Sequence, residues 1–342
     1  MNRGPREERA ARAVDVLVVG AGPAGLAAAA RLAAAGAGRV EILEREPNAG
    51  GLPRLCAHPG FGADPRGRAL DGQGYARRAV RAARRAGAVL RTGVSVTGWA
   101  APLALETTAP TGLATIEARA IVLTTGARER ARPARLLPGT RPQGILTTGE
   151  LLRTVSLFGH RPEPIGRRAV VVGAGPLAEH AVRLLRHAGV AVAAVLCEGP
   201  RAAIGGDLRV PVLTHTVVTE LTGRGRLAGV TIRRTDGATD GPTGRARART
   251  LACDTLVLTG DWIPEHELAR AGGLPLDPVT RGPLVDAALR TGVPGVFAAG
   301  GLLRGGVPAV RAAAEGRAVA GAVLAHLVGG DSSPGLVGAA EV

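Results

Sequence analysis

The feature that most constrains the fold of this chain is an apolar run that ends directly in a glycine-rich turn. Asp15 to Val19 reads DVLVV, and Gly20-Ala21-Gly22-Pro23-Ala24-Gly25 follows it at once. The β-branched run predicts a buried strand, and the Ala/Leu-rich stretch from Ala24 to Ala35 predicts a helix. Val40 to Leu43 predicts the next strand. The order of strand, turn, helix and strand defines a βαβ unit.

The spacing of glycines in this turn fits a site for the pyrophosphate of a dinucleotide. Gly20 permits a tight turn, Gly22 lets the pyrophosphate approach the backbone, and Gly25 lets the helix pack closely on the strand. The helix N-terminus adds free N–H groups and the positive end of its dipole. Glu44, at the end of the second strand, is placed to accept hydrogen bonds from a ribose. The alternative is a glycine-rich turn that holds no ligand.

A second unit of the same kind begins at residue 169. Ala169 to Val172 predicts a strand, and Gly173-Ala174-Gly175-Pro176-Leu177-Ala178 forms the turn. Leu177 to His187 predicts the helix, and Val190 to Leu196 the returning strand. The sequence therefore predicts an α/β fold with two Rossmann-like dinucleotide-binding domains.

An acidic residue two positions beyond the second returning strand indicates which nucleotide this unit prefers. Glu198 occupies the place where a carboxylate binds a free 2′-hydroxyl and repels a 2′-phosphate, which favours NADH over NADPH. Arg201 lies nearby and weakens this preference. A degenerate second domain, kept for packing alone, is the alternative.

The remaining segments alternate between short apolar runs and turns. Residues 52 to 75 are rich in Gly and Pro and predict a long irregular loop, and residues 223 to 249 predict a polar-edged hairpin. Further helices are expected over Tyr75 to Ala86 and Pro308 to Leu327, and further strands over Val89 to Arg91, Thr115 to Ala118, Ala120 to Thr124, Thr255 to Thr259 and Val296 to Ala299.

Composition excludes several classes of function. The formal charge is +15, but every basic residue is an arginine, and the arginines are scattered without neighbouring aromatics, so nucleic acid is not expected as a partner. No apolar run is long enough for a membrane span, and Met1 to Ala13 is charged, so we expect a cytoplasmic protein. Cys56, Cys197 and Cys253 include no CxxC pair, which argues against a disulfide framework, a zinc site and a dithiol relay.

Five motifs in order resemble the flavoproteins with two dinucleotide-binding domains, in particular the thioredoxin-reductase-like group. They are the turns at Gly20 and Gly173, Thr124 to Ala127, Gly260 to Pro264, and Gly295 to Gly300. The resemblance implies an FAD domain interrupted by an NAD(P)H domain. It implies the following division: a disordered arm at 1–13, the FAD domain at 14–160 and 259–328, the NAD(P) domain at 166–258, and a flexible tail at 329–342.

The turns and the resemblance together predict the cofactor-binding residues. They are Gly20, Gly22, Pro23, Ala24, Gly25, Glu44, Arg45, Gly51, Val96, Thr125, Gly126, Ala127, Gly173, Gly175, Pro176, Leu177, Ala178, Glu198, Gly260, Asp261, Gly300 and Gly301. No metal ligands are predicted, because the histidines show no metal-ligand spacing.

Two positions depart from the family pattern. The redox-active CxxC of thioredoxin reductases would fall near Ile145 to Glu150, where this chain reads ILTTGE, so disulfide reduction by that route is excluded. Gly301 stands where the family usually has an Asp that hydrogen-bonds the ribityl chain of FAD.

A narrower resemblance rests on Gly50 to Gly62, which reads GGLPRLCAHPGFG, and on Thr125 to Arg130. Both are similar to the FAD-binding subunits of opine, proline and cyanide-forming glycine oxidases or dehydrogenases, which act on C–N bonds. No cysteine follows Cys253, so no iron–sulfur cluster is expected at the C-terminal end. A homodimer or a partner subunit is the association that this resemblance implies.

Cys56 and His58 are the candidate catalytic residues. They lie in the long loop that runs beside the isoalloxazine ring in related flavoproteins, so either could contact the substrate or transfer a proton. The alternative for Cys56 is a small buried apolar residue without a redox role.

These observations predict an FAD-dependent oxidoreductase. In the main interpretation the flavin passes a hydride between NAD(P)H, with NADH favoured, and a small organic substrate. In a second interpretation the chain is the FAD subunit of an amine or imino-acid oxidase or dehydrogenase. In a third it is a flavin-binding subunit without catalysis of its own.

Overall fold

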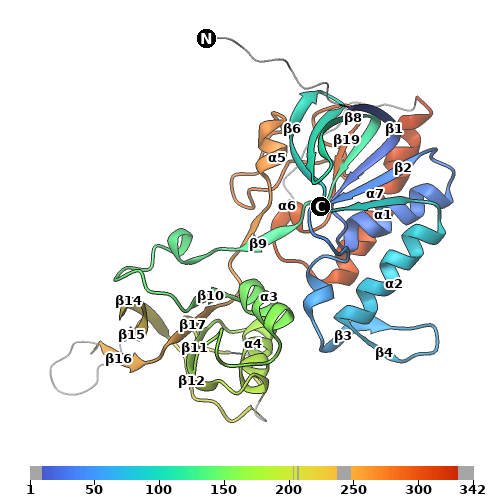
Figure 1. The fold of residues 1–342 in the computed structure, drawn as a ribbon. Coiled ribbons are helices and arrows are strands. Elements are labelled where there is room, and N and C mark those ends of the chain that lie inside the picture. The colour runs from blue at the N-terminus through green and yellow to red at the C-terminus, as the bar shows by residue number, and fades with distance from the viewer. Residues whose placement is uncertain (1–9, 203, 206–207, 237–247, 330–342) are drawn as a thin grey trace, which may run out of the picture. The chain divides into compact units, whose positions relative to one another are not determined.

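A computed structural model describes residues 10–202, 204–205, 208–236 and 248–329 (Figure 1). The chain forms two units. Unit 1 comprises residues 1–128 and 263–342, and unit 2 comprises residues 129–262. Each unit is built on its own largely parallel sheet with helices packed against it.

The sheet of unit 1 has the strand order β5-β2-β1-β8-β7-β6, and β19 pairs with β8. Strand β1 is central because its DVLVV run is buried on both faces, and Leu17 pairs with Glu41 on one side and Ile121 on the other. Strands β6 and β7 add an antiparallel hairpin. The strands are β1 (Ala10–Val19), β2 (Val40–Glu44), β5 (Val89–Thr92), β6 (Ser95–Ala101), β7 (Ala104–Ala109), β8 (Gly112–Leu123) and β19 (Val296–Ala298).

Helix packing in unit 1 is tightest between α1 (Pro23–Ala34) and α7 (Ala309–Leu327). A Cβ atom at Gly316 of α7 would lie 2.1 Å from the Ala24 carbonyl oxygen, so only glycine allows this approach. The close contact seats α7 against the first turn of α1. Helix α2 (Gly72–Arg85) packs on α1 and begins at Asp71, whose carboxylate accepts a hydrogen bond from the Gly74 N–H.

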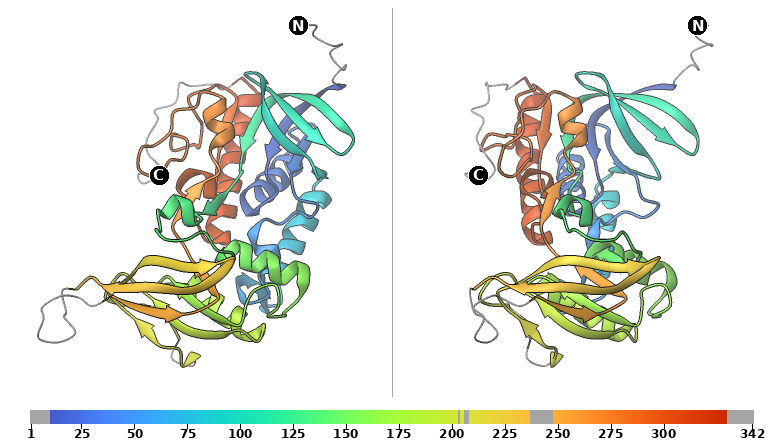
Figure 2. Two further views of the ribbon diagram at one scale, coloured as in Figure 1. Left: turned by 60° about the vertical axis from the view of Figure 1, so that its left-hand side comes forward. Right: turned by 90° about the vertical axis from the view of Figure 1, so that its left-hand side faces the viewer.

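Unit 2 contains a parallel sheet of order β10-β17-β11-β12-β13 and an antiparallel sheet of order β14-β15-β16. Figure 2 shows the antiparallel strands in yellow and orange. Helix α4 (Pro176–His187) buries Ala178, Val182 and Leu185 against the parallel sheet. The strands are β10 (Ile145–Thr147), β11 (Arg168–Val172), β12 (Ala191–Leu196), β13 (Val212–Leu213), β14 (Thr216–Arg224), β15 (Arg226–Arg234), β16 (Arg249–Ala252) and β17 (Thr255–Leu258).

Short elements complete both units. They are η1 (Leu52–Leu55), β3 (Pro59–Ala63), β4 (Ala69–Asp71), β9 (Ala127–Glu129), η2 (Arg132–Arg135), α3 (Thr148–Phe158), β18 (Trp262–Pro264), α5 (Glu267–Ala271) and α6 (Gly301–Arg304).

The division of the chain differs from the one expected from sequence. The chain passes from unit 1 to unit 2 at residue 129, not near 160. The reason is that β10 pairs with β17 and thereby joins the sheet of unit 2. The chain returns to unit 1 at residue 263, four residues after the expected position at 259.

Three local expectations are also corrected. The expected arm at 1–13 overlaps β1, because residues from Ala10 onward pair with β8; residues 1–9 of that arm and the tail from residue 330 lie outside the described residues. Part of the expected loop at 52–75 is a hairpin, since β3 pairs with β4. The two expected strands around Thr115 and Ala120 are one continuous strand, β8.

Candidate functional site

The glycine turn of unit 1 is closed at two glycines and open at the third. A Cβ atom at Gly20 would lie 2.4 Å from the Thr124 carbonyl oxygen, and one at Gly25 would lie 2.0 Å from the Gly20 oxygen. Those two glycines are therefore required by packing. At Gly22 no atom lies within 4 Å of the Cβ position, and the backbone has an ordinary φ of −82°. The open position is the one through which a pyrophosphate is expected to approach.

Glu44, at the end of β2, is hydrogen-bonded to this turn. Its buried carboxylate accepts hydrogen bonds from the N–H groups of Ala21, at 3.0 Å, and Glu46, at 2.9 Å. Each carboxylate oxygen has a second lone pair, so Glu44 can still accept hydrogen bonds from ribose hydroxyls. Pro23 occupies the first helical position of α1, where its missing N–H costs no hydrogen bond.

Three further predicted segments converge on the turn. A Cβ atom at Gly51 would lie 2.9 Å from Gly22 Cα, and one at Gly300 would lie 2.8 Å from Ala24 Cβ. A Cβ atom at Gly301 would lie 3.5 Å from both Gly126 Cα and the Ala127 nitrogen, which is ordinary van der Waals contact. The structure thus brings together the loops that follow β2, β8 and β19, as the sequence order implies for a sheet of this type.

The predicted residues at the edge of this site are less enclosed. The Arg45 side chain is exposed, and its Nη2 lies 3.5 Å from Glu265 Oε1. The Thr125 hydroxyl donates to the Glu265 carbonyl oxygen at 2.8 Å. Val96 is half-buried on β6 against the core of unit 1.

A carboxylate missed by the sequence analysis lies beside Gly300. Glu315 of α7 accepts a hydrogen bond from the Gly300 N–H at 2.9 Å and forms ion pairs with Arg304 and Arg311. It holds the turn in which Gly301 replaces the family's Asp. No local sequence signal marks it, because it is 15 residues away on a helix face.

Cys56 and His58 occupy different environments. Cys56 is buried, its Sγ lies 3.6 Å from the Leu52 carbonyl oxygen, and burial raises the pKa of its thiol to about 11. The His58 ring is half-buried, with Nδ1 2.7 Å from the Pro59 carbonyl oxygen and a tilted contact with Phe61. The thiol is therefore protonated at neutral pH, whereas the imidazole is accessible.

The glycine turn of unit 2 repeats the pattern of unit 1. A Cβ atom at Gly173 would overlap the Thr259 hydroxyl, whereas Gly175 has no atom within 4 Å of its Cβ position. Ala178, the third small residue, is fully buried against the sheet. Pro176 and Leu177 begin α4, and Glu198 is exposed just beyond β12. Unit 2 therefore has a second turn that is open at its middle glycine.

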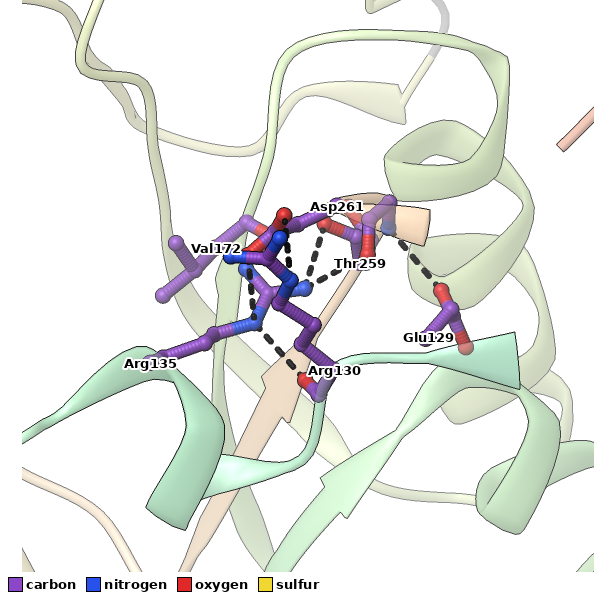
Figure 3. A network of polar contacts seen from close by, with 7 residues as sticks. Glu129, Arg130, Arg135, Val172, Thr259 and Asp261 are labelled. Atoms are coloured by element: carbon purple, nitrogen blue, oxygen red, sulfur yellow. Dashed lines mark hydrogen bonds and ion pairs between the residues drawn. The ribbon is translucent and has the colours of Figure 1, made fainter. Parts of the chain in front are cut away.

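Gly260 and Asp261 belong to a polar network inside unit 2, and Figure 3 labels Asp261 together with Glu129, Arg130 and Arg135. The Gly260 N–H donates to Glu129 at 2.9 Å, and Glu129 also accepts from the Gly149 N–H. Asp261, at a φ of +55°, pairs with Arg130 and Arg135 at 3.5 and 3.8 Å. Desolvation raises the pKa of the Glu129 carboxyl. Both predicted residues are thus engaged in contacts that fix the returning segment.

Unit 2 also has a cavity that is separate from the predicted site residues. It measures about 620 Å³ and is lined by residues between Ala131 and Glu150 together with Leu258. None of the residues predicted to bind a cofactor is among those that line it. The cavity therefore adds no support to either glycine turn as a nucleotide site.

Each unit thus has a glycine turn that follows a parallel strand and is open at its middle glycine. Residues 14–316 match the model of the pyridine nucleotide-disulphide oxidoreductase family, and the chain belongs to that family. The predicted superfamily, the fold with two Rossmann-like domains and the enzyme class, an FAD-dependent oxidoreductase, are confirmed.

Two curated relatives, each one subunit of an opine oxidase, are similar over part of the chain. The subunit from Agrobacterium tumefaciens (strain Ach5) is 32% identical over 210 residues, which are 57% of this chain and 39% of the relative. The one from Rhizobium meliloti is 34% identical over 193 residues, 53% of this chain and 35% of the relative. The match therefore spans well under half the length of either relative.

Solved structures share the fold at low identity. The thioredoxin reductase of T. acidophilum superposes with a TM-score of 0.72 at 23% identity, covering 93% of this chain and 99% of that one. The L-proline dehydrogenase of P. horikoshii gives a TM-score of 0.65 at 18% identity, covering 96% of this chain and 58% of that one. In the part of the chain that the structure describes, none of the helices combines the length and apolarity needed to cross a bilayer.

Proposed function

We propose that unit 1 holds FAD and that the flavin passes a hydride between a nicotinamide nucleotide and a small organic substrate. The observation that supports this most is the turn at Gly20 to Gly25, open only at Gly22, with Glu44 fixed beside it. Bound FAD would supply the hydride chemistry. The chain would supply backbone N–H groups and the dipole of α1 for the phosphates, and Glu44 for the ribose.

Unit 2 is proposed to bind the nicotinamide nucleotide at the turn of Gly173 and Gly175. The open Gly175, at the start of α4, supports this because it leaves room for a pyrophosphate to approach the backbone. Glu198 favours NADH over NADPH by repelling a 2′-phosphate, and Arg201 opposes that preference. Glu198 is exposed, so solvent screens this repulsion and the discrimination is expected to stay within about 1 kcal/mol.

C–N bond oxidation is the second candidate for the reaction. The 32% and 34% identity to the two opine oxidase chains supports it, as does the segment from Gly50 to Gly62. In this version an amine or imino acid gives the hydride to the flavin, and a partner subunit or another acceptor takes the electrons. Both relatives are named as one subunit of an oxidase, which supports a partner subunit here as well.

Neither reaction uses a thiol of this chain. Cys56 is buried and protonated, and β10 and the start of α3 read ILTTGE where the resemblance to thioredoxin reductases would place a CxxC. Hydride therefore moves directly between substrate or nucleotide and flavin, without a thiol–disulfide relay.

An anaerobic series of absorption spectra tests this function. The FAD-loaded protein is mixed in turn with NADH, NADPH and a panel of amino acids and opine-type secondary amines. Rapid loss of the oxidised flavin band with NADH, more slowly with NADPH, supports the main reaction, and bleaching by an amine alone supports C–N oxidation. A protein that holds FAD but is bleached by neither class of donor would contradict both.

A further inference from the structure

We propose that Arg54 binds the phosphates of FAD in unit 1, as a charged donor contributed by the loop that follows β2. This inference rests on the proposed FAD site. It adds a side chain to a site otherwise composed of backbone N–H groups, and Arg54 is absent from the set of residues predicted to bind the cofactor.

The position of Arg54 is fixed relative to the glycine turn. The Gly50 N–H donates to the Ala21 carbonyl oxygen at 2.8 Å, and Gly51 lies directly against Gly22. The Arg54 N–H then donates to the Gly51 carbonyl oxygen at 3.3 Å, which starts the short helix η1. Arg54 therefore belongs to a loop that is hydrogen-bonded to the turn and packed on its open glycine.

The Arg54 side chain has an unused donor. Its guanidinium is mostly enclosed, at 19% exposure, and Nη2 lies 3.2 Å from Glu46 Oε2. Nε is buried and has no hydrogen-bond partner among the described residues. A buried donor on a charged group is costly to leave unpaired, so Nε is expected to have an acceptor that this chain does not provide.

Local charge identifies that acceptor as a phosphate. The Glu44 carboxylate lies at the turn and the Glu46 carboxylate pairs with Arg54, and the pyrophosphate of FAD would add further negative charge. A cation within the site offsets this repulsion, and the planar guanidinium can bind phosphate oxygens through two N–H groups. Glu46 holds one edge of the guanidinium and leaves Nε free for the ligand.

Among the described residues one other arginine has a buried Nε without a hydrogen-bond partner, but it does not lie beside a predicted phosphate site. Arg12 pairs with the fully buried Glu41 and lies near the start of β1, at the opposite end of that strand from Gly20. Of the two, Arg54 is thus the orphaned arginine that lies beside a predicted phosphate site.

The test measures ligand affinity rather than turnover. Arg54→Gln is made in a Gly175→Val background, which closes the second turn so that ADP reports on unit 1 alone. Arg68→Gln is the control, because Arg68 also pairs with a nearby carboxylate, Asp64, but is exposed. FAD affinity is measured by fluorescence titration of the apoprotein, and ADP and riboflavin affinity by calorimetry.

We expect Arg54→Gln to weaken FAD and ADP binding by about 10- to 100-fold, the scale of one charged hydrogen-bonding group. Riboflavin, which has no phosphate, should bind equally to the variant and its parent, and Arg68→Gln should change nothing. Should Arg54→Gln fail to fold, Arg54→Lys is used, and a loss of ADP affinity of at least about threefold is expected because Lys cannot form the planar fork.

The outcomes separate this inference from the proposed function. If the parent binds FAD and ADP but a folded Arg54 variant binds ADP within about twofold of it, the assignment of Arg54 is wrong and the FAD site stands. Equal losses for riboflavin and ADP would mean that Arg54 only shapes the loop. A parent that binds neither FAD nor ADP would overturn the FAD site itself.

Discussion

At the scale of single residues, Cys56 decides between direct hydride transfer to the flavin and a relay through a reactive thiol. With its pKa raised to about 11 by burial, only about one thiol in a thousand is ionised at pH 8. We therefore expect Cys56→Ser to keep flavin reduction within about threefold of the parent, measured by stopped-flow absorbance with the best donor. Cys253→Ser is the control, since burial raises the pKa of that thiol to about 11 as well.

The opposite result would be just as clear. A loss of more than about a hundredfold, equivalent to about 2.7 kcal/mol in the barrier, with FAD still bound, would make Cys56 a redox partner of the flavin. Rapid alkylation of Cys56 in the folded protein at pH 8 would point the same way.

Sequence spacing located the glycine turn and assigned each of its three glycines a separate role. The contacts add the physical detail, because a Cβ atom at Gly20 or Gly25 would overlap backbone atoms whereas the Cβ position of Gly22 is open. Arg54 and Glu315 had no signal at all, because an orphaned Nε and a hydrogen bond across 15 residues depend on loop conformation. Side-chain partners of this kind depend on long-range packing, which periodicity does not encode.

Helix α3 offers a test at the scale of one element. Thr147 accepts a hydrogen bond from the Glu150 N–H, and the Glu150 carboxylate accepts one from the Thr147 N–H, which forms a capping box. Thr147→Ala should lower the unfolding free energy of unit 2 by about 1 kcal/mol. Urea unfolding followed by tryptophan fluorescence measures this. The control is Thr154→Ala, at a half-buried position of the same helix where the hydroxyl donates to the Glu150 carbonyl oxygen.

Equal midpoints for Thr147→Ala and Thr154→Ala would show that the capping box contributes nothing. FAD affinity should be unchanged in both variants, since neither residue belongs to unit 1.

At the same scale, elements with strong local patterns were predicted well and those defined by pairing were not. The strands and helices around both glycine turns match their predicted bounds to within one residue, because their apolar runs are continuous, except that β1 begins at Ala10 and not at Asp15. Strand β10 was missed, since ILT is too short to stand out and becomes a strand only through β17. That one omission moved the expected boundary between the units by about 30 residues.

For the whole molecule, the central claim is that the two units divide the cofactors, with FAD in unit 1. The two open glycines, Gly22 and Gly175, make the claim testable because each has an extended backbone that other residues can adopt. Valine at either position should leave the fold intact and fill only the space meant for a pyrophosphate.

The most direct measurement is an FAD titration of the apoprotein, compared among the parent, Gly22→Val and Gly175→Val, with circular dichroism confirming that each is folded. We predict that the parent and Gly175→Val each bind one FAD per chain with similar affinity, and that Gly22→Val binds at least about a hundredfold more weakly, a loss of about 2.7 kcal/mol. Full FAD occupancy in a folded Gly22→Val protein, or loss of FAD from Gly175→Val instead, would contradict the assignment of FAD to unit 1.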